Sequence, residues 1–145
     1  MALSSEEREL IQQGFRKVTE NGQEAADRFY AHLFEIAPQT SELFLNDMEL
    51  QGAQFISKLG LIVAELQNFE SLLPVLEDLA LRHVAYGVRP EHYPPVGEAL
   101  QRMLAEVLED DYTPAVRAAW AKAYGDIADV MIRSSYTHSV PLGQR

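Results

Sequence analysis

The sequence predicts an all-α fold with about six to seven helices, on two observations. Apolar residues recur three or four positions apart in long segments along the 145-residue chain, which is the spacing of one face of an α-helix. Prolines, glycines and capping residues separate these segments, and no segment alternates apolar and polar residues as a half-buried β-strand does. The length suits one domain, residues 1–145, with ordered helices over about 5–135 and a tail at 136–145.

The first two helices have clear local boundaries. Ser4 and Glu7 have the spacing of a capping box, and the helix that they begin is interrupted at Asn21. A second helix is expected over about 24–37, because six apolar residues share one face there and Pro38 then prevents its continuation.

The third and fourth helices follow a short turn. Asp47 is placed to cap a long helix over about 48–66. Ser71 is placed to cap the next helix, which ends at Gly87 in the left-handed conformation that favours glycine. His83 lies on the apolar face of this fourth helix.

The last two helices begin at prolines. Pro90 suits the first turn of a fifth helix that continues to about Leu108. Thr113-Pro114 begins the sixth helix, which carries Trp120 on its apolar face.

Composition excludes several classes of function. The formal net charge of −10 repels phosphate backbones and anionic lipid, which argues against nucleic acid and membrane partners. The absence of cysteine excludes disulfides, thiolate metal sites and a cysteine nucleophile. The N-terminal residues lack the pattern of a secretion signal and no apolar run reaches membrane-spanning length, so a cytoplasmic location is expected.

His83 is the candidate for chemistry. An iron porphyrin takes its axial ligand from an apolar wall, and neutral imidazole donates to iron without adding charge to a dry pocket. The alternative is a partly buried histidine whose ring only bonds a backbone carbonyl, and periodicity alone favours that alternative. We expect the other histidines, His32, His92 and His138, to be exposed.

Three segments together resemble a known family. They are LRHVAYGVRPEHYPPVG at 81–97, FYAHLF at 29–34 followed by Pro38 and Leu43-Phe44, and AWAKAYG at 119–125. The combination resembles bacterial single-domain globins and the globin domain of flavohaemoglobins over about residues 5–135. The resemblance implies a globin fold, a three-over-three helical sandwich enclosing one b-type haem.

The resemblance also implies roles for individual residues. His83 would be the proximal iron ligand and Phe44 would stack against the porphyrin. Gln51 and Tyr30 would be distal hydrogen-bond donors to an anionic diatomic ligand, and Phe55 would form a wall of the distal pocket. Without the family context, we would interpret Tyr30 as a core tyrosine whose hydroxyl reaches backbone or water. Gln51 would be interpreted as a solvated helix residue.

Further contacts with the haem are expected from Leu79, Val88, Tyr93 and Val96. Arg82 could reach a haem propionate, although a solvated arginine is the commoner outcome. Flavohaemoglobins pair the tyrosine matching Tyr93 with a glutamate on the last helix, but Ser135 stands at the expected position here. The proximal hydrogen-bond network should therefore differ.

Three functions compete. The leading hypothesis is reversible binding of dioxygen, carbon monoxide and nitric oxide for oxygen storage, delivery or scavenging. The second is an enzyme, a nitric oxide dioxygenase, which would need a separate reductase because no reductase domain is present in this sequence. The third is a haem-free globin-like signalling module. Both a monomer and a homodimer are compatible with the sequence.

Overall fold

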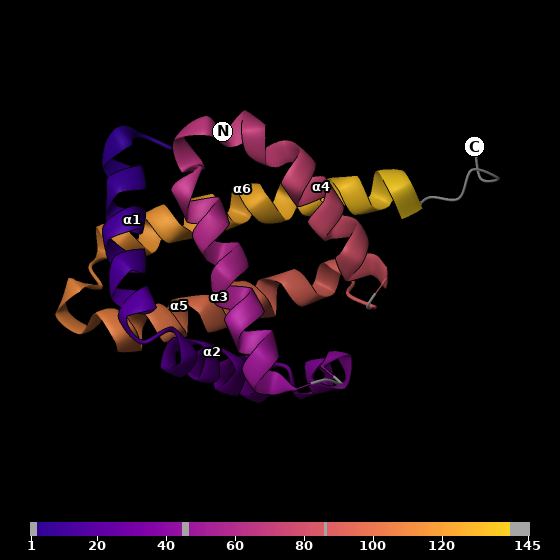
Figure 1. The fold of residues 1–145 in the computed structure, drawn as a ribbon, viewed down its shortest axis with the longest axis horizontal. Coiled ribbons are helices and arrows are strands. Elements are labelled where there is room, and N and C mark those ends of the chain that lie inside the picture. The colour runs from indigo at the N-terminus through magenta and orange to yellow at the C-terminus, as the bar shows by residue number, and fades with distance from the viewer. Residues whose placement is uncertain (1–2, 45–46, 86, 140–145) are drawn as a thin grey trace.

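The computed structural model describes residues 3–44, 47–85 and 87–139, with side chains described as far as residue 134. These residues form six α-helices and four short 3₁₀ helices and contain no β-strand, which confirms the predicted all-α class (Figure 1). The α-helices are α1 (Ser5–Glu20), α2 (Gly22–Ile36), α3 (Met48–Ala64), α4 (Phe69–Ala85), α5 (Tyr93–Leu108) and α6 (Pro114–Ser139). The 3₁₀ helices are η1 (Pro38–Leu43), η2 (Leu66–Asn68), η3 (Pro90–His92) and η4 (Glu109–Asp111).

Three of the predicted helix starts are confirmed by their hydrogen bonds. The capping box at α1 is complete, because the Ser4 hydroxyl accepts from the Glu7 backbone and the Glu7 carboxylate accepts from the Ser4 backbone. At α3 the Asp47 carboxylate accepts from the backbone of Glu49 at 2.8 Å. At α6 the Thr113 hydroxyl accepts from the Val116 backbone at 3.2 Å.

Two other predicted starts were wrong. Ser71 does not cap α4, which begins at Phe69 as a direct continuation of η2, and the Ser71 hydroxyl instead donates to the Asn68 carbonyl at 2.7 Å. Pro90 begins the 3₁₀ helix η3, and α5 starts only at Tyr93. The next two residues are prolines, which fit the first turn of α5 because the backbone N–H groups they lack are unpaired there anyway.

The last helix is longer than expected. The sequence places residues 136–145 in a tail, whereas α6 continues to Ser139. No glycine or proline interrupts the chain between Gly125 and Pro141, so nothing breaks the helix over this span.

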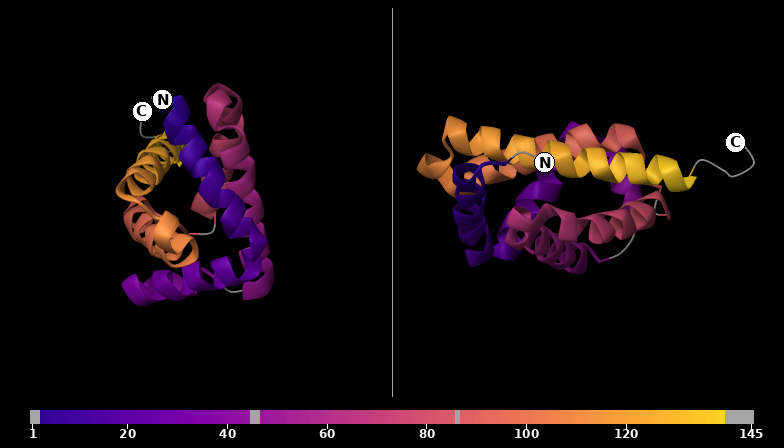
Figure 2. Two further views of the ribbon diagram at one scale, coloured as in Figure 1. Left: turned by 90° about the vertical axis from the view of Figure 1, so that its left-hand side faces the viewer. Right: turned by 90° about the horizontal axis from the view of Figure 1, so that it is seen from above.

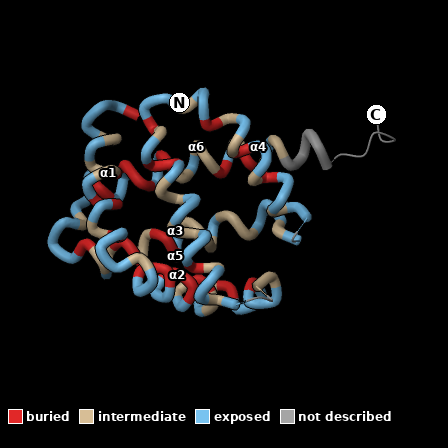
Figure 3. The backbone as a smooth tube through the Cα atoms, viewed as in Figure 1, coloured by how far each residue is buried: buried red, intermediate tan, exposed pale blue. Residues whose placement is uncertain are grey.

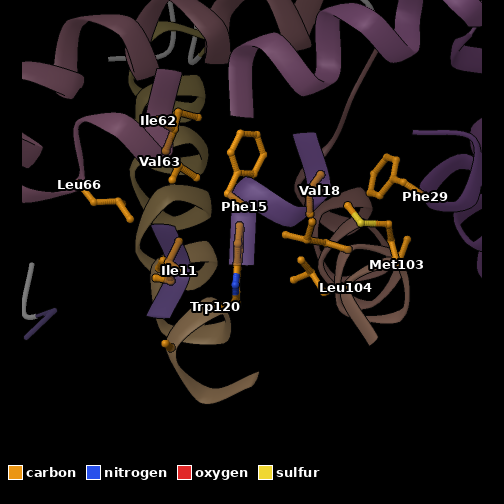
Figure 4. Close-up of a cluster of buried hydrophobic side chains, with 14 of the residues drawn as sticks. Ile11, Phe15, Val18, Phe29, Ile62, Val63, Leu66, Met103, Leu104 and Trp120 are labelled. Atoms are coloured by element: carbon orange, nitrogen blue, oxygen red, sulfur yellow. The ribbon is translucent and has the colours of Figure 1, made fainter. Parts of the chain in front are cut away.

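The helices pack across one another (Figure 2). The main contacts join α2 to α5, α4 and α1 to α6, and α2 to α3. Apolar side chains from α1, α3, α5 and α6 meet in one core (Figure 4), including Ile11, Phe15, Val18, Ile62, Val63, Met103, Leu104 and Trp120. Buried positions accordingly lie on the inner sides of the helices and exposed positions on the outer sides (Figure 3).

The pair α3 and α4 frames the candidate site. The helical segments on either side of Glu65 are bent by 63° relative to each other, so that α3 and α4 meet at η2 and then diverge (Figure 1). The far end of α3 carries Gln51 and the far end of α4 carries His83.

No single helix among the described residues is long and apolar enough to cross a membrane. The segments Met48–Ala64 and Leu66–Ala85 meet that length and composition only as a bent pair.

Candidate haem site

Aromatic side chains from α2, α3 and the loop after η1 meet beside the start of α3. The Phe29 ring stacks on Phe55 with centroids 4.2 Å apart, and the Tyr30 and Phe44 rings meet at 70° in a T-shaped arrangement with centroids 5.2 Å apart. The ring centroid of Phe34 lies 5.7 Å from that of Phe44. Phe55 and Phe44 are only partly buried, whereas Phe29 and Tyr30 are buried. The structure therefore brings together three of the expected site residues, Tyr30, Phe44 and Phe55.

Tyr30 is a buried tyrosine with an unused hydroxyl. Its side chain is 8% exposed, and burial raises the pKa of the phenol to about 12. None of the hydrogen bonds within the described residues involves the Tyr30 hydroxyl. A backbone partner for this group, the alternative open from the sequence, is therefore not found among those residues.

Gln51 lies on α3 one turn before Phe55 and is partly buried. Its side-chain amide makes no hydrogen bond with any described residue. The adjacent Gly52 sets how closely α3 approaches α2, because a Cβ at this position would lie 2.9 Å from the Cβ of Ala26. This close approach places Gln51 and Phe55 next to the helix that carries Tyr30.

His83 is held in one ring orientation. Its Nδ1 lies 2.8 Å from the Leu79 carbonyl oxygen one turn earlier on α4. A carbonyl oxygen can only accept, so Nδ1 carries the hydrogen and the neutral ring keeps the lone pair on Nε2. Burial lowers the pKa of His83, and the hydrogen bond to Leu79 partly opposes this effect. No described residue makes a hydrogen bond with Nε2.

The end of α4 fixes the backbone at His83. Gly87 adopts φ +94°, in the left-handed region predicted for this glycine. The turn lets the Val88 N–H donate to the His83 carbonyl at 2.9 Å and the Gly87 N–H donate to the Val84 carbonyl at 3.0 Å. His83 therefore occupies the last full turn of α4, next to a backbone reversal that only glycine adopts without strain.

Comparison with known proteins assigns the family. The globin family model matches residues 27–131. This chain belongs to the globin family. It is 33% identical over 132 residues to a flavohemoprotein of Rhizobium meliloti and 32% identical over 127 residues to one of Bacillus subtilis, alignments that cover 89% and 86% of this chain. The chain spans about a third of the length of these relatives (33% and 32%).

Solved structures agree with the assignment. An engineered carbene transferase from Rhodothermus marinus, described as a candidate nitric oxide dioxygenase, superposes with a TM-score of 0.87 at 27% identity, covering 98% of this globin and 99% of that chain. A bacterial globin from Campylobacter jejuni shares the fold, with a TM-score of 0.83 at 24% identity over 95% of this globin and all of that chain. Globins of this kind bind haem and, through it, diatomic ligands.

Tyr124 is a residue near the site that the sequence did not single out. Its hydroxyl donates to the Tyr93 carbonyl at 2.6 Å, which ties α6 to the first turn of α5. Burial raises the pKa of both tyrosines, and in Tyr124 the nearby Tyr93 adds to the effect. In the sequence, the signal available for this contact was the glycine at position 97. A Cβ there would lie 2.8 Å from the Tyr124 ring. The side chain of Ser135 lies outside the described residues.

The remaining expected contacts divide into two groups. Leu79, Val88, Tyr93 and Val96 are partly buried. Arg82 is exposed, and its Nε lies 2.9 Å from an Asp78 carboxylate oxygen. In this structure Arg82 is therefore a solvated arginine, the commoner of the two expected outcomes.

The other histidines are less exposed than expected. His32 is partly buried and its Nε2 lies 3.0 Å from a Glu106 carboxylate oxygen on α5. His92 is partly buried, and its Nδ1 accepts from the Arg89 backbone at 2.9 Å. The side chain of His138 lies outside the described residues.

The residues present fit a haem. The described residues contain no group of three or more histidine, cysteine or carboxylate side chains that could hold a metal ion by themselves. One imidazole with a free Nε2, together with partly covered apolar and aromatic side chains, suits instead an iron whose equatorial ligands come from a porphyrin.

Proposed function

We propose that this globin binds haem b with His83 as the proximal ligand and holds a diatomic ligand beside Tyr30 and Gln51. The observation that carries the proposal is the hydrogen bond from His83 Nδ1 to the Leu79 carbonyl, because it leaves Nε2 as the free donor atom. When bound, the haem iron supplies the coordination position that dioxygen, carbon monoxide or nitric oxide occupies.

On the proximal side, the protein keeps the imidazole neutral and oriented. Burial disfavours the protonated ring, and the Leu79 carbonyl fixes its rotation about the side-chain bonds. A carbonyl partner is uncharged, so it adds less electron density to the ring than an anionic carboxylate would. We therefore infer a proximal ligand with weaker donor character than one paired with a glutamate.

On the distal side, Tyr30 and Gln51 supply hydrogen-bond donors. With a pKa of about 12, the Tyr30 phenol stays protonated at neutral pH and can donate. Hydrogen bonds to a charged acceptor contribute roughly 1.5–3 kcal/mol each. Neither side chain needs to break a bond to another described residue in order to donate. Phe44 would stack on the porphyrin and Phe55 would exclude water from the ligand.

Nitric oxide dioxygenase activity is the second candidate, and the similarity to flavohemoproteins and to the candidate dioxygenase favours it. Oxidation of nitric oxide to nitrate by dioxygen consumes one electron per turnover, which a separate reductase would supply. Sustained nitrate formation with a reductase and reduced nicotinamide would support the enzyme. A single stoichiometric conversion would leave oxygen binding as the function.

The deciding experiment is the optical spectrum of the purified protein in ferric, reduced and carbon monoxide-bound forms. The wild type should show a Soret band that shifts with reduction and with carbon monoxide. His83→Ala should lose or reshape this band and recover it with added imidazole, whereas His92→Ala, a matched histidine from the same segment, should resemble the wild type. A wild type without a Soret band after reconstitution would overturn the proposal and leave a haem-free signalling module.

A further inference from the structure

The outer side of α3 carries a continuous exposed stripe without charge. Its members recur at intervals of three and four residues, which places them on one face of the helix within roughly 80° of arc. They are Leu50, Ala53, Ser57, Leu61 and Ala64, and all are exposed. We refer to them as the α3 stripe.

The two leucines of the α3 stripe are unusually accessible. Leu50 is 56% exposed and Leu61 is 44% exposed. The described residues include two other large exposed apolar side chains, Leu81 and Val84 on α4. That pair is interrupted by the exposed charges of Arg82 and its partner Asp78, so it does not form an uncharged surface.

The absence of charge is significant because the whole chain is acidic. With a net charge of −10, two copies repel each other over most of their surfaces. A contact between copies is therefore least opposed where the surface has no carboxylates. Between Glu49 and Glu65, α3 has no acidic residue, and its one charged side chain there, Lys58, lies beside the stripe.

The order of side chains in the α3 stripe is complementary to itself. Leu50 and Ala64 are equally far from Ser57 along the chain, and so are Ala53 and Leu61. When two copies of α3 pack antiparallel about a two-fold axis at Ser57, each leucine of one copy lies level along the helices with an alanine of the other. Large side chains then enter the gaps above small ones, which is the condition for close helix packing.

We propose that this globin self-associates through the α3 stripe, as an antiparallel, two-fold symmetric pair of α3 helices. A 17-residue helix is about 25 Å long. One helix pair of this length falls below the contact area of a standard stable interface. The dimer is therefore weak and dependent on concentration.

The symmetry makes a specific prediction for crosslinking, because the chain has no cysteine of its own. Helix axes 8–10 Å apart bring the two Cα atoms of residue 57, which meet at the two-fold axis, to about 3.5–5.5 Å, a range that overlaps the Cα separation of a disulfide. Two copies of residue 50 would be separated by roughly 20 Å along the helices. Under mild oxidation, Ser57→Cys should form covalent dimers at least about tenfold faster than Leu50→Cys.

The control for crosslinking is Leu81→Cys, which introduces a thiol at an exposed apolar position outside the stripe. Equal rates at positions 57, 50 and 81 would indicate random collision and overturn the proposal. A faster rate at position 50 or 81 would also overturn it, because no antiparallel pair centred on Ser57 allows it.

Sedimentation velocity tests the same contact without a covalent bond. The average mass of the wild type should rise between about 10 μM and 1 mM protein, the range of a weak complex. Leu61→Glu should abolish this rise, because it places a carboxylate inside the contact, and Leu81→Glu should not. A wild type that stays monomeric throughout would overturn the proposal, as would association that survives Leu61→Glu.

Discussion

At the scale of single residues, the site is defined by polar atoms that the protein leaves without partners. No hydrogen bond with a described residue is made by the Tyr30 hydroxyl, the Gln51 side-chain amide or His83 Nε2. Other tyrosine hydroxyls are used, since Tyr124 donates to the Tyr93 carbonyl and Tyr112 pairs with Gln101. The Tyr30, Gln51 and His83 atoms can therefore each bond a ligand without first breaking a hydrogen bond to a described residue.

Replacing Tyr30 with phenylalanine tests the distal donor. Tyr30→Phe removes only the hydroxyl, so the aromatic contacts with Phe44 and Phe55 should persist. We expect dioxygen to dissociate roughly 10- to 100-fold faster, the equivalent of one hydrogen bond to a charged acceptor. Stopped-flow displacement of dioxygen by carbon monoxide measures this rate. Tyr112→Phe, at a tyrosine that follows η4 and pairs with Gln101, should leave the rate unchanged.

His83 could be named as a candidate from the sequence because its signal is local. His83 lies on an apolar helix face in a segment that resembles the globin proximal segment. The hydrogen bond between Tyr124 and the Tyr93 carbonyl could not be predicted in this way, because it depends on how α5 and α6 cross. The pairing of His32 with Glu106 likewise joins α2 to α5 and leaves no local signal.

At the scale of elements, the end of α4 determines where His83 is held. A Cβ on Gly87 would be in ordinary contact at 3.5 Å from Leu43, so the constraint at this position is the backbone angle of +94°. Helix ends of this kind were predictable because they depend on a few adjacent residues. Starts at Ser71 and Pro90 were not, because a 3₁₀ helix precedes α4 and α5 and moves the boundary.

Two glycine substitutions should have opposite effects on stability. Gly87→Ala should lower the free energy of unfolding by about 1–2 kcal/mol, because alanine is strained at positive φ. Gly125→Ala should raise it by about 0.5–1 kcal/mol, because this α6 glycine has open space around it and alanine favours the helix. Chemical denaturation of both variants measures the difference. Equal destabilisation by both would show that the left-handed turn is not the reason for Gly87.

A charged cluster between α2 and α5 should give a defined pH dependence. The hydrogen bond from His32, with a further one from Arg28, holds the pKa of Glu106 below its ordinary value of 4.5. A carboxylate with a lowered folded-state pKa stabilises the fold above its ordinary pKa, and this contribution is lost as the pH falls below about 4.5. The contribution is modest, because the Glu106 side chain is 39% exposed and solvent screens the pairs.

Glu106→Gln should therefore lower the free energy of unfolding by roughly 0.5–1 kcal/mol at neutral pH. The difference from the wild type should shrink toward zero as the pH falls through the lowered pKa of Glu106, because the wild-type carboxylate then loses its charge as well. Denaturation curves at several pH values measure it. Glu20→Gln, at an exposed glutamate without a described ion pair, should show little change, and a difference that grows in acid would contradict the assignment.

At the scale of the whole molecule, burial is distributed unevenly around the candidate site. The helix α5 has buried residues from Ala99 to its end, including Leu100, Met103 and Leu104. By contrast, α4 has no buried residue after Ala80 among those described, and α3 has none from 53 to 61. The segment 53–61 contains Phe55 and lies beside Gln51, and the segment after Ala80 contains His83. A haem bound at these residues would therefore stabilise these two segments most.

Removing the haem should accordingly loosen these segments and leave the rest of the fold in place. We expect amides at 53–61 and 81–85 to exchange with solvent at least about tenfold faster in the haem-free protein, whereas amides of α5 around Met103 should change little. Hydrogen exchange followed by mass spectrometry resolves the two groups, and circular dichroism should show that most helix is retained. A uniform acceleration across all helices would instead indicate that haem stabilises the fold as one cooperative unit. His83→Ala reconstituted with haem separates coordination from occupancy: if the iron bond to His83 is what orders the end of α4, exchange at 81–85 should stay fast while exchange at 53–61 slows.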